Sequence, residues 1–322
     1  MTCRPLCVLI PTVAGGPLLR RAVAACLADG AERVLIIAAD PTIGALPAGV
    51  EALRLPRRTP FAPAINAGLA EVGPDEDVLL LNDDAAPLPG CLPALRAAAR
   101  VPGLYQPRLL FDDGSGLVEN LGHRLFLDGS NLARGRGQPD PGPAPGRVPI
   151  GAASGAALFI AAAARARLGP LWGDLGAFGE DLDYALRAAR LGLPVALVPA
   201  AAALHRLGAS HGQAGPGKVY DVERNRLRVA ARSLPLSLLL TSPLWTVHRY
   251  AHLSRAALRG EGLGAAAGPM GGAAALLGLA RGLADLPEAL ALRAADRPGW
   301  VRGERAMLRH IFRTLDRDIL KV

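Results

Sequence analysis

Two short polar segments carry the residue types that chemistry at a phosphate or a hydroxyl group requires. The first is Asn82-Asp83-Asp84, which directly follows the apolar run Val78–Leu81. Carboxylates at the end of a strand can hold a hard divalent cation through oxygen and leave other positions for phosphate oxygens and water. Such a cation stabilises the negative charge of a departing phosphate group. The alternative is a solvated turn, because Asn and Asp are common turn formers.

The second segment is Glu180-Asp181, at the expected start of a helix over Leu182–Leu191. A carboxylate placed there can act as a general base and take a proton from a hydroxyl group. Two structural explanations remain open. The helix dipole favours acidic residues in a first turn. Asp183 and Arg187 are also four residues apart, which allows an ion pair on the helix surface.

His205 and Ser154-Gly155 are further candidates for ligand contacts. His205 follows the expected strand Leu193–Val198 and could complete a metal site. A histidine satisfied within a loop is the alternative, and His205 with His211 does not make a specific zinc pattern. Ser154-Gly155 could present a hydroxyl and an open backbone to a ligand, or Gly155 could serve tight core packing.

Strands that alternate with helices must position these residues. The expected strands are Cys7–Thr12, Val34–Ile37 and Val78–Leu81, and the expected helices between and after them are Leu18–Leu27, Pro63–Val72 and Leu88–Arg100. This alternation predicts an α/β fold with an open, mostly parallel sheet covered on both faces by helices. In such sheets ligands bind beyond the carboxyl ends of the strands. Thr12, Asp40 and Asn82–Asp84 all lie at expected strand ends, so we expect them to meet at one crevice.

Charge is concentrated in the last third of the chain. The 322 residues carry a formal net charge of +8, and residues 221–322 hold 16 Lys or Arg against 9 Asp or Glu, a net of +7. A helical, basic region suits an anionic partner such as a membrane surface. Aromatic residues are scarce and no zinc-finger spacing occurs, so we expect no nucleic-acid partner.

Two uncharged stretches, Ser233–His248 and Gly262–Ala280, approach the length of a membrane span. A spanning helix needs about 20 predominantly apolar residues. The first stretch contains two prolines and the second contains six glycines, so we expect an amphipathic region that lies on the bilayer. Residues 128–148 are rich in Gly, Pro and Arg without a hydrophobic period, which predicts a mobile surface loop.

The cysteines and the N-terminus favour a cytoplasmic protein. The cysteine spacing fits neither a disulfide framework nor a paired metal site, so we expect buried free thiols in a reducing compartment. The first residues contain a single Arg before the first strand, and we expect no signal peptide. The cysteines are Cys3, Cys7, Cys26 and Cys91.

The segments described above belong to a longer series of motifs along residues 6–232. They are Val8–Thr12, Phe61–Leu69 with Asn66, Leu80–Asp84 followed by Leu88-Pro89-Gly90, Ser154–Leu158, Phe178–Asp183 with Arg187, His205 with Ser210, and Tyr220 with Arg224-Asn225. This ordered set resembles family 2 glycosyltransferases, especially their bacterial rhamnosyltransferase-like branch. The sequence departs from the family pattern at Asp83, where the family usually has Pro, and at Asp40, which stands without a second acidic residue.

The resemblance implies a GT-A fold over residues 1–225, followed by a helical, basic, membrane-associating region over 226–322. The implied reaction is inverting transfer of a sugar, for which we expect a deoxyhexose such as rhamnose, from a nucleotide-diphosphate donor. The acceptor would be a hydroxyl of a glycan or lipid-linked molecule in cell-envelope polysaccharide synthesis. The enzyme would then work in the cytoplasm, peripherally at the inner face of the plasma membrane.

The resemblance also implies a role for each candidate residue. Asp181 would be the catalytic base, with Glu180 beside it to orient or bind the acceptor. Asp84 and His205 would hold Mg²⁺ or Mn²⁺. The nucleotide sugar would contact Thr12, Asp40, Asn66, Asn82, Asp83, Ser154 and Gly155.

Two other functions fit parts of the sequence. A catalytically silent protein that binds nucleotide sugars or glycans could have the same fold, although retention of Asp84 and Glu180-Asp181 argues against it. A sugar nucleotidyltransferase would carry a Gly-rich loop with Arg or Lys after its first strand. Val13-Ala14-Gly15-Gly16, followed by Arg20-Arg21, is a faint match to that loop.

Overall fold

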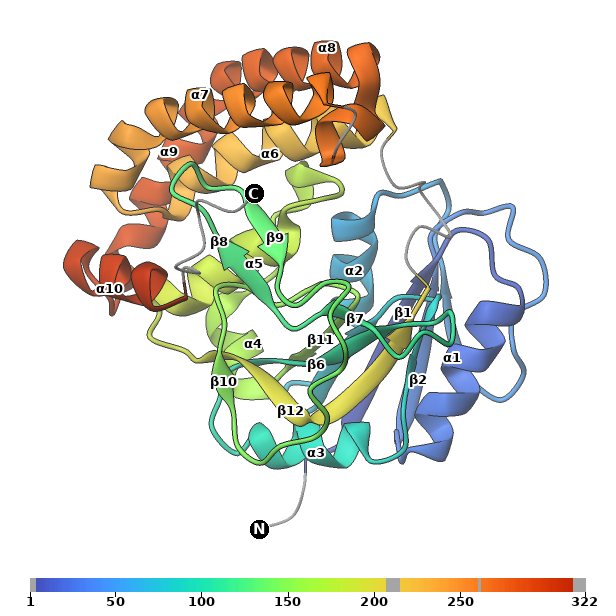
Figure 1. Ribbon diagram of the computed structural model, residues 1–322. Helices are drawn as coiled ribbons and strands as arrows, with labels where there is room; N and C mark the ends of the chain where they lie inside the picture. Colours follow the sequence, from blue (N-terminus) through green and yellow to red (C-terminus); the bar gives the residue numbers. More distant parts are fainter. Residues whose placement is uncertain (1–3, 207–214, 260–261, 315–322) are drawn as a thin grey trace. The chain divides into compact units, whose positions relative to one another are not determined.

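The computed structural model describes residues 4–206, 215–259 and 262–314 (Figure 1). The chain divides into two compact units. Unit 1 comprises residues 1–123, 133–188 and 193–209, and unit 2 comprises residues 124–132, 189–192 and 210–322. The expected division between residues 225 and 226 falls inside helix α6 (Pro216–Ser233).

Unit 1 is built around a mixed sheet. Its strand order within the described residues is β10-β12-β6-β11-β4-β1-β2-β3, with β5 paired to β12 and β7 paired to β6. The strands of this sheet are β1 (Leu6–Thr12), β2 (Arg33–Ala38), β3 (Glu51–Arg54), β4 (Asp77–Leu81), β5 (Ala85–Pro87), β6 (Leu104–Phe111), β7 (Val118–Asn120), β10 (Val148–Pro149), β11 (Ala157–Ile160) and β12 (Val195–His205). The short strands β8 (His123–Leu125) and β9 (Asn131–Ala133) pair with each other.

Helices connect these strands, as expected for an α/β fold. They are α1 (Pro17–Ala28), α2 (Phe61–Ala70), α3 (Cys91–Ala98), α4 (Ala162–Leu168), the short helix η1 (Gly173–Leu175) and α5 (Glu180–Arg190). β1, β2, β3 and β4 run parallel, and antiparallel neighbours enter at β11. The expectation of an α/β fold with an open, mostly parallel sheet flanked by helices is therefore confirmed.

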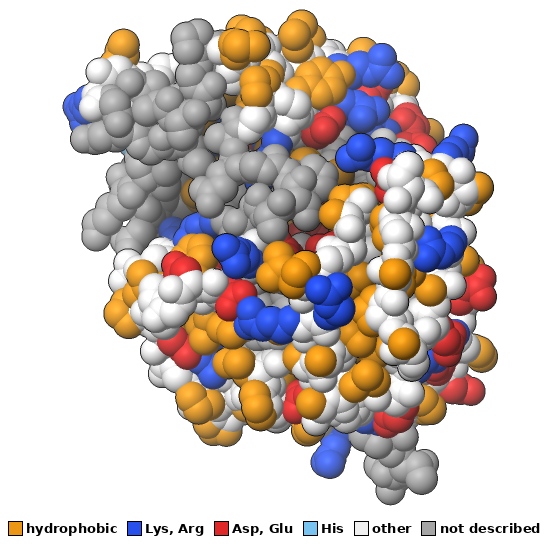
Figure 2. All heavy atoms as spheres, turned by 90° about the vertical axis from the view of Figure 1, so that its right-hand side faces the viewer, with side chains coloured by type: hydrophobic (Ala, Val, Ile, Leu, Met, Phe, Trp, Pro, Cys, Tyr) orange, Lys and Arg blue, Asp and Glu red, His pale blue; other side chains and the backbone are white. Residues whose placement is uncertain are grey.

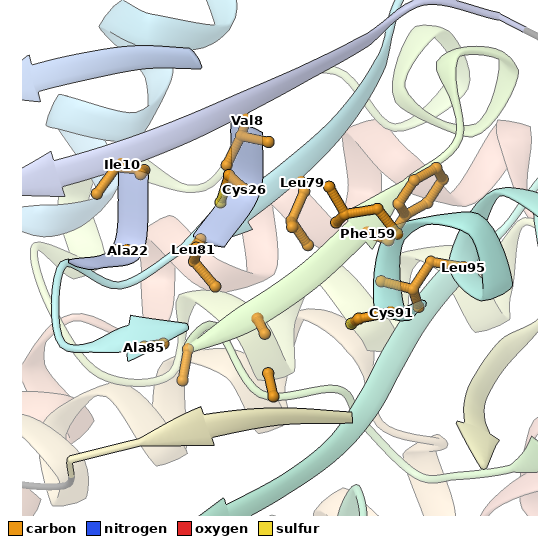
Figure 3. Packing of buried hydrophobic residues seen from close by; sticks show 14 of the residues in the cluster. Val8, Ile10, Ala22, Cys26, Leu79, Leu81, Ala85, Cys91, Leu95 and Phe159 are labelled. Carbon is orange, nitrogen blue, oxygen red and sulfur yellow. The ribbon is translucent and has the colours of Figure 1, made fainter. Parts of the chain in front are cut away.

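Apolar side chains of the central strands pack against α1 and α3 (Figure 3). β1 and β4 are buried along their whole length, which explains why their sequences read as continuous apolar runs rather than alternating ones. The thiols of Cys7, Cys26 and Cys91 are free and buried, as expected, and burial raises the pKa of Cys26 to about 12. Cys3 lies outside the described residues.

The last strand differs from the sequence prediction, which ended it at Pro199. β12 continues through Pro199 to His205, with an irregularity in its pairing to β6 between Val198 and Ala202. A bulge tolerates proline because a residue there need not donate to the ladder. The carbonyl of Pro199 instead accepts a hydrogen bond of 2.7 Å from buried Arg108 Nε. His205 is therefore the final residue of a strand, not part of a loop after it.

Unit 2 contains the helices after residue 215. They are α6 (Pro216–Ser233), α7 (Leu236–Leu258), α8 (Gly262–Ala284), α9 (Leu286–Asp296), η2 (Arg297–Gly299) and α10 (Glu304–Thr314). The glycines of α8 permit a close helix crossing. A Cβ at Gly278 would lie 2.4 Å from the Tyr220 carbonyl oxygen, and one at Gly282 would lie 2.8 Å from that of Arg224. Among the described helices, none has both the length and the apolarity to span a membrane.

Most arginines on α6 are bound within unit 2. Three of them, spaced four residues apart, form ion pairs of 2.7 to 2.8 Å with carboxylates at or near α9. The pairs are Arg224–Asp285, Arg228–Glu288 and Arg232–Asp296. The charge that made the C-terminal region look like an anion-binding surface is thus partly neutralised inside the unit.

Asp183 and Arg187 form the ion pair that their spacing allows, but the pair is buried instead of lying on the helix surface. Arg187 Nε lies 2.8 Å from Asp183 Oδ2, and the exposed fractions of the two side chains are 10% and 0%. Arg187 also donates hydrogen bonds to the carbonyls of Leu168 and Pro170. The pair therefore attaches α5 to the last residue of α4 and to the segment that follows it.

Replacing Arg187 with Met tests this attachment. The change keeps an apolar stem but leaves a fully buried carboxylate without its guanidinium, which typically costs about 3–5 kcal/mol. We expect the free energy of unfolding, measured by urea denaturation, to fall by about 3 kcal/mol or more. Arg281→Met is the matched control, since Arg281 also pairs with an acid four residues away but is 57% exposed. Arg281→Met should lower the free energy of unfolding by less than about 1 kcal/mol. Equal decreases in the two variants would contradict a stabilising role for the buried pair.

Candidate active site

The buried contact between Asp84 and His205 forms the centre of the site. Asp84 follows β4 and immediately precedes β5, which pairs antiparallel with β12 so that Ala85 lies opposite His205. The Arg206 amide donates a 3.0 Å hydrogen bond to the Asp84 carbonyl and extends this pairing. His205 Nε2 consequently lies 3.2 Å from Asp84 Oδ1, with both side chains less than 10% exposed.

Glu119 on β7 approaches the other ring nitrogen of the imidazole. Its Oε2 lies 3.4 Å from His205 Nδ1, and the side chain is buried. Burial alone lowers the pKa of His205, but the hydrogen bonds to Asp84 and Glu119 outweigh burial and raise the pKa to about 9. Without a metal ion the protonated imidazole is therefore stabilised between two carboxylates, and an ion bound at Nε2 would take the place of that proton. Glu119 could not be identified from the sequence, because a three-residue strand gives no signal that its acidic side chain turns inward.

Asn82 and Asp83 lie beside this pair, as expected from their place after β4. Asn82 Nδ2 is 3.5 Å from His205 Nε2. Asp83 Oδ2 accepts a 2.5 Å hydrogen bond from the hydroxyl of Thr12, at the end of the neighbouring strand β1. The Thr12 hydroxyl also accepts a 2.9 Å hydrogen bond from the Gly15 amide, so this residue orients Asp83 and the turn after β1.

Backbone pairing connects this group to Asp181. β11 runs antiparallel to β4, so the segment before β11 lies beside the end of β4. The Asn82 amide donates a 3.0 Å hydrogen bond to the Ala156 carbonyl. One residue earlier, the Gly155 amide donates a 3.0 Å hydrogen bond to Asp181 Oδ2. The two acidic segments of the sequence are thus linked through Gly155-Ala156.

Gly155 leaves room next to Asp181. A Cβ built on it would meet Asp181 Cβ, Asp181 Oδ2 and a carbon of Phe61 at 3.7 to 3.8 Å, which are ordinary contact distances. Tight core packing, one of the two explanations for this glycine, therefore does not account for it. Ser154 lies beside it, with its amide donating to Gln106 Oε1 and its hydroxyl accepting from the Ala156 amide.

Glu180 and Asp181 occupy the first turn of α5 in different environments. Asp181 is half-buried, and Glu180 is buried with no hydrogen-bond partner for Oε2 among the described residues. Burial, followed by the charge of Asp181, raises the pKa of Glu180 from 4.5 to about 8. At neutral pH Glu180 therefore holds a proton.

The backbone just before α5 adopts an unusual conformation. Phe178 has φ of 66° and Gly179 has φ of 94°, so two consecutive residues are left-handed. For a bulky residue such as Phe178 this conformation is strained, and such strain concentrates at functional sites. It turns the chain immediately before Glu180-Asp181. Of these two residues, only Gly179 is of a type that predicts a positive φ.

Asp40 and Asn66 make separate contacts of their own. Asp40 lies beyond β2 and accepts two hydrogen bonds from Thr42, which lower its pKa; its nearest guanidinium is that of Arg58 at 3.8 Å. The amide group of Asn66 is occupied at both ends by the backbone of Leu171, at 2.9 Å each. Asn66 thereby fixes the segment before η1. Ser210, also named by the sequence motifs, lies outside the described residues.

The donor atoms of Asp84 and His205 fit a divalent cation. Their separation of 3.2 Å matches the roughly 3 Å between adjacent ligands of a six-coordinate ion with bonds of about 2.1 Å. Glu119 completes the common arrangement in which a metal-binding histidine donates its second N–H to a carboxylate. No group of three or more His, Cys, Asp or Glu side chains is arranged to hold a metal within residues 4–206, 215–259 and 262–314. An ion held by Asp84 and His205 alone would complete its shell with phosphate oxygens and water.

Comparisons with known proteins show the fold. No protein-family profile and no curated protein sequence matches the chain. Among solved structures, GalNAc-T7 with UDP, GalNAc and Mn²⁺ is similar, with a TM-score of 0.56, 14% identity, and coverage of 73% of this chain and 49% of that chain. This chain thus spans about half of the GalNAc-T7 chain.

Residues 1–349 of TarS from S. aureus, with and without UDP-GlcNAc, give a TM-score of 0.51, 13% identity, and coverage of 92% of this chain and 93% of that chain. GalNAc-T7 and TarS are glycosyltransferases, and the chain shares their fold.

Replacing Glu119 with Gln tests whether this residue orients His205 for a cation. Loss of such a carboxylate typically weakens metal affinity about 10- to 100-fold. We expect this loss in Mn²⁺ titrations followed by electron paramagnetic resonance with UDP present. Glu51→Gln is the control, because Glu51 lies on β3 and forms an ion pair near the surface with Arg33 of β2. Equal Mn²⁺ affinities for Glu119→Gln and the unchanged protein would contradict the assignment.

Replacing Glu180 with Gln tests the raised pKa. A carboxyl whose pKa is higher in the folded chain contributes stability below its unfolded pKa, near 4.5, and loses that contribution as pH rises through about 8. We expect the melting temperature of the unchanged protein to fall more than that of Glu180→Gln between pH 5 and about 9. Parallel pH profiles for the two proteins would show that Glu180 is not held protonated.

Proposed function

We propose that this protein is an inverting glycosyltransferase that uses a nucleotide-diphosphate sugar. The observation that carries the proposal is the link, through Gly155-Ala156, between a half-buried Asp181 and the Asp84–His205 pair. An inverting displacement needs one base for the acceptor and one stabilised leaving group. The two groups are candidates for these two roles, and the shared fold with GalNAc-T7 and TarS supports the assignment.

In the proposed reaction, Asp181 takes the proton of an acceptor hydroxyl. The acceptor oxygen forms a bond to the anomeric carbon while the bond from that carbon to the diphosphate breaks, and the electron pair leaves with the diphosphate. A Mg²⁺ or Mn²⁺ ion bound by Asp84 and His205 would supply positive charge for this leaving group. The hydrogen bond from the Gly155 amide fixes the orientation of Asp181, and Glu180 beside it would contact the acceptor.

Most of the remaining candidate residues would contact the nucleotide sugar directly, and one would act by positioning the backbone. Asn82, Ser154 and Gly155 would contact the nucleotide sugar, and Asp83 would do so in the orientation that Thr12 imposes. Asp40 would contact the base or ribose from the end of β2. Asn66 would act indirectly, because its amide group already binds the backbone of Leu171.

Two kinds of similarity bear on the donor sugar. The family resemblance favours a deoxyhexose such as rhamnose, whereas the similar solved structures contain UDP with GalNAc and UDP-GlcNAc. We propose a glycan or lipid-linked acceptor in cell-envelope synthesis, and action at the inner face of the plasma membrane.

Donor hydrolysis and transfer assays test the proposal. The assays would use dTDP-rhamnose, UDP-GlcNAc and UDP-GalNAc with Mn²⁺ and a lipid-linked acceptor extract. We expect Asp181→Asn to lower kcat about 10²- to 10⁴-fold, because general base catalysis contributes that much. Asp84→Ala should abolish the dependence of the rate on Mn²⁺.

Asp75→Asn is the matched control, since Asp75 is exposed and precedes the opposite end of β4. Full activity of both Asp181→Asn and Asp84→Ala would refute the site. Donor binding without turnover would identify a silent binding protein. Pyrophosphate release from a nucleoside triphosphate would identify a nucleotidyltransferase.

A further inference from the structure

Helix α7 presents an apolar stripe to solvent. Its members recur at intervals of three, four or eleven residues, which places them on one face of the helix. Figure 2 shows hydrophobic side chains gathered at the height of α7 and α8 in Figure 1. The stripe, with exposed fractions in parentheses, is Leu236 (52%), Leu240 (72%), Leu244 (72%), Val247 (69%) and Leu258 (89%).

Positive charge flanks the stripe. Arg255 and Arg259 lie within one turn of Leu258 and have no ion-pair partner among the described residues. Neither α7 nor α8 contains a single Asp or Glu in its 23 residues. Arg224, Arg228 and Arg232 of α6 differ, because they are paired with acidic residues at or near α9.

The opposite face of α7 is fixed within unit 2. Arg249 Nε lies 2.6 Å from Asp128 Oδ2, and its guanidinium also binds Glu223 at 2.8 Å. Ser242 and Thr246 are buried on this side. These contacts hold one face of the helix inside the unit, and the stripe lies on the face that α7 turns to solvent.

We propose that this stripe of α7 binds the surface of a phospholipid bilayer that contains anionic headgroups. An amphipathic helix lies in the interface plane with its apolar face among the acyl chains and its basic residues at the headgroups. A second copy of the chain fits less well. In a symmetric contact between two α7–α8 faces, Arg255 and Arg259 would meet no carboxylate, since neither helix has one.

Bilayer binding would hold the protein at the surface where a membrane-bound acceptor lies, and this consequence rests on the function proposed above. The binding itself, however, is measured without donor or acceptor. Loss of glycosyl transfer would therefore leave this proposal standing, and loss of vesicle binding would leave the catalytic assignment standing.

Co-sedimentation of the full chain with vesicles tests the proposal. One vesicle type is phosphatidylcholine alone, and the other contains equal parts of phosphatidylcholine and phosphatidylglycerol. We expect binding to the mixed vesicles and about 100-fold weaker binding for Leu240→Gln/Leu244→Gln/Val247→Gln, because three apolar side chains no longer enter the interface. Leu27→Gln/Val101→Gln/Val148→Gln is the matched control, since these apolar residues of unit 1 are 39% to 47% exposed.

A second variant tests the contribution of the two arginines that flank the stripe. Arg255→Gln/Arg259→Gln should bind the mixed vesicles about 30-fold more weakly, from about 1 kcal/mol for each arginine near an anionic surface. Its binding to phosphatidylcholine alone should be unchanged. The proposal is overturned if the unchanged protein stays in the supernatant with both vesicle types, or if the stripe variant sediments as the control does. It is also overturned if light scattering shows a dimer that the stripe variant converts to a monomer.

Discussion

The register between β5 and β12 is the constraint on which the site depends. It places Ala85 opposite His205, and therefore brings Asp84 to 3.2 Å from the imidazole. A shift of one residue would turn every side chain of β12 to the other face of the sheet and remove His205 from the contact. The bulge after Val198 is needed for the same register, because it accommodates Pro199 and lets β12 continue as far as His205. β11 runs antiparallel to β4 and thereby places Gly155 beside the end of β4. The Gly155 amide in turn binds Asp181.

Burial gives the carboxylates of unit 1 different roles although their chemistry is the same. Asp183 is fully buried but matched by Arg187, so its charge serves attachment of α5. Glu180 is buried without a cation, which raises its pKa and keeps it neutral. Asp181, one residue further on, is half-buried and held by the Gly155 amide. Only the last combination suits a base that must meet a substrate.

Unit 2 shows how composition can mislead when charges are counted without partners. Its net positive charge suggested a basic surface, yet Arg224, Arg228 and Arg232 neutralise carboxylates at or near α9. The glycines of α8 likewise serve helix packing, because the backbone of α6 lies so close to Gly278 and Gly282 that a Cβ at either position would clash with it. What faces solvent on α7 is instead an apolar stripe with two arginines at its end.

The sequence by itself determined the alternation of strands and helices and the placement of Asn82–Asp84 and Glu180-Asp181 at element ends. Local propensity and periodicity suffice for these, because they depend on residues within a few positions of one another. Only the tertiary structure decided that Asn82 and His205, 123 residues apart, share a site, that Glu119 supports them, and that Asn66 is occupied elsewhere. Those contacts follow from strand register and burial, which no local spacing encodes.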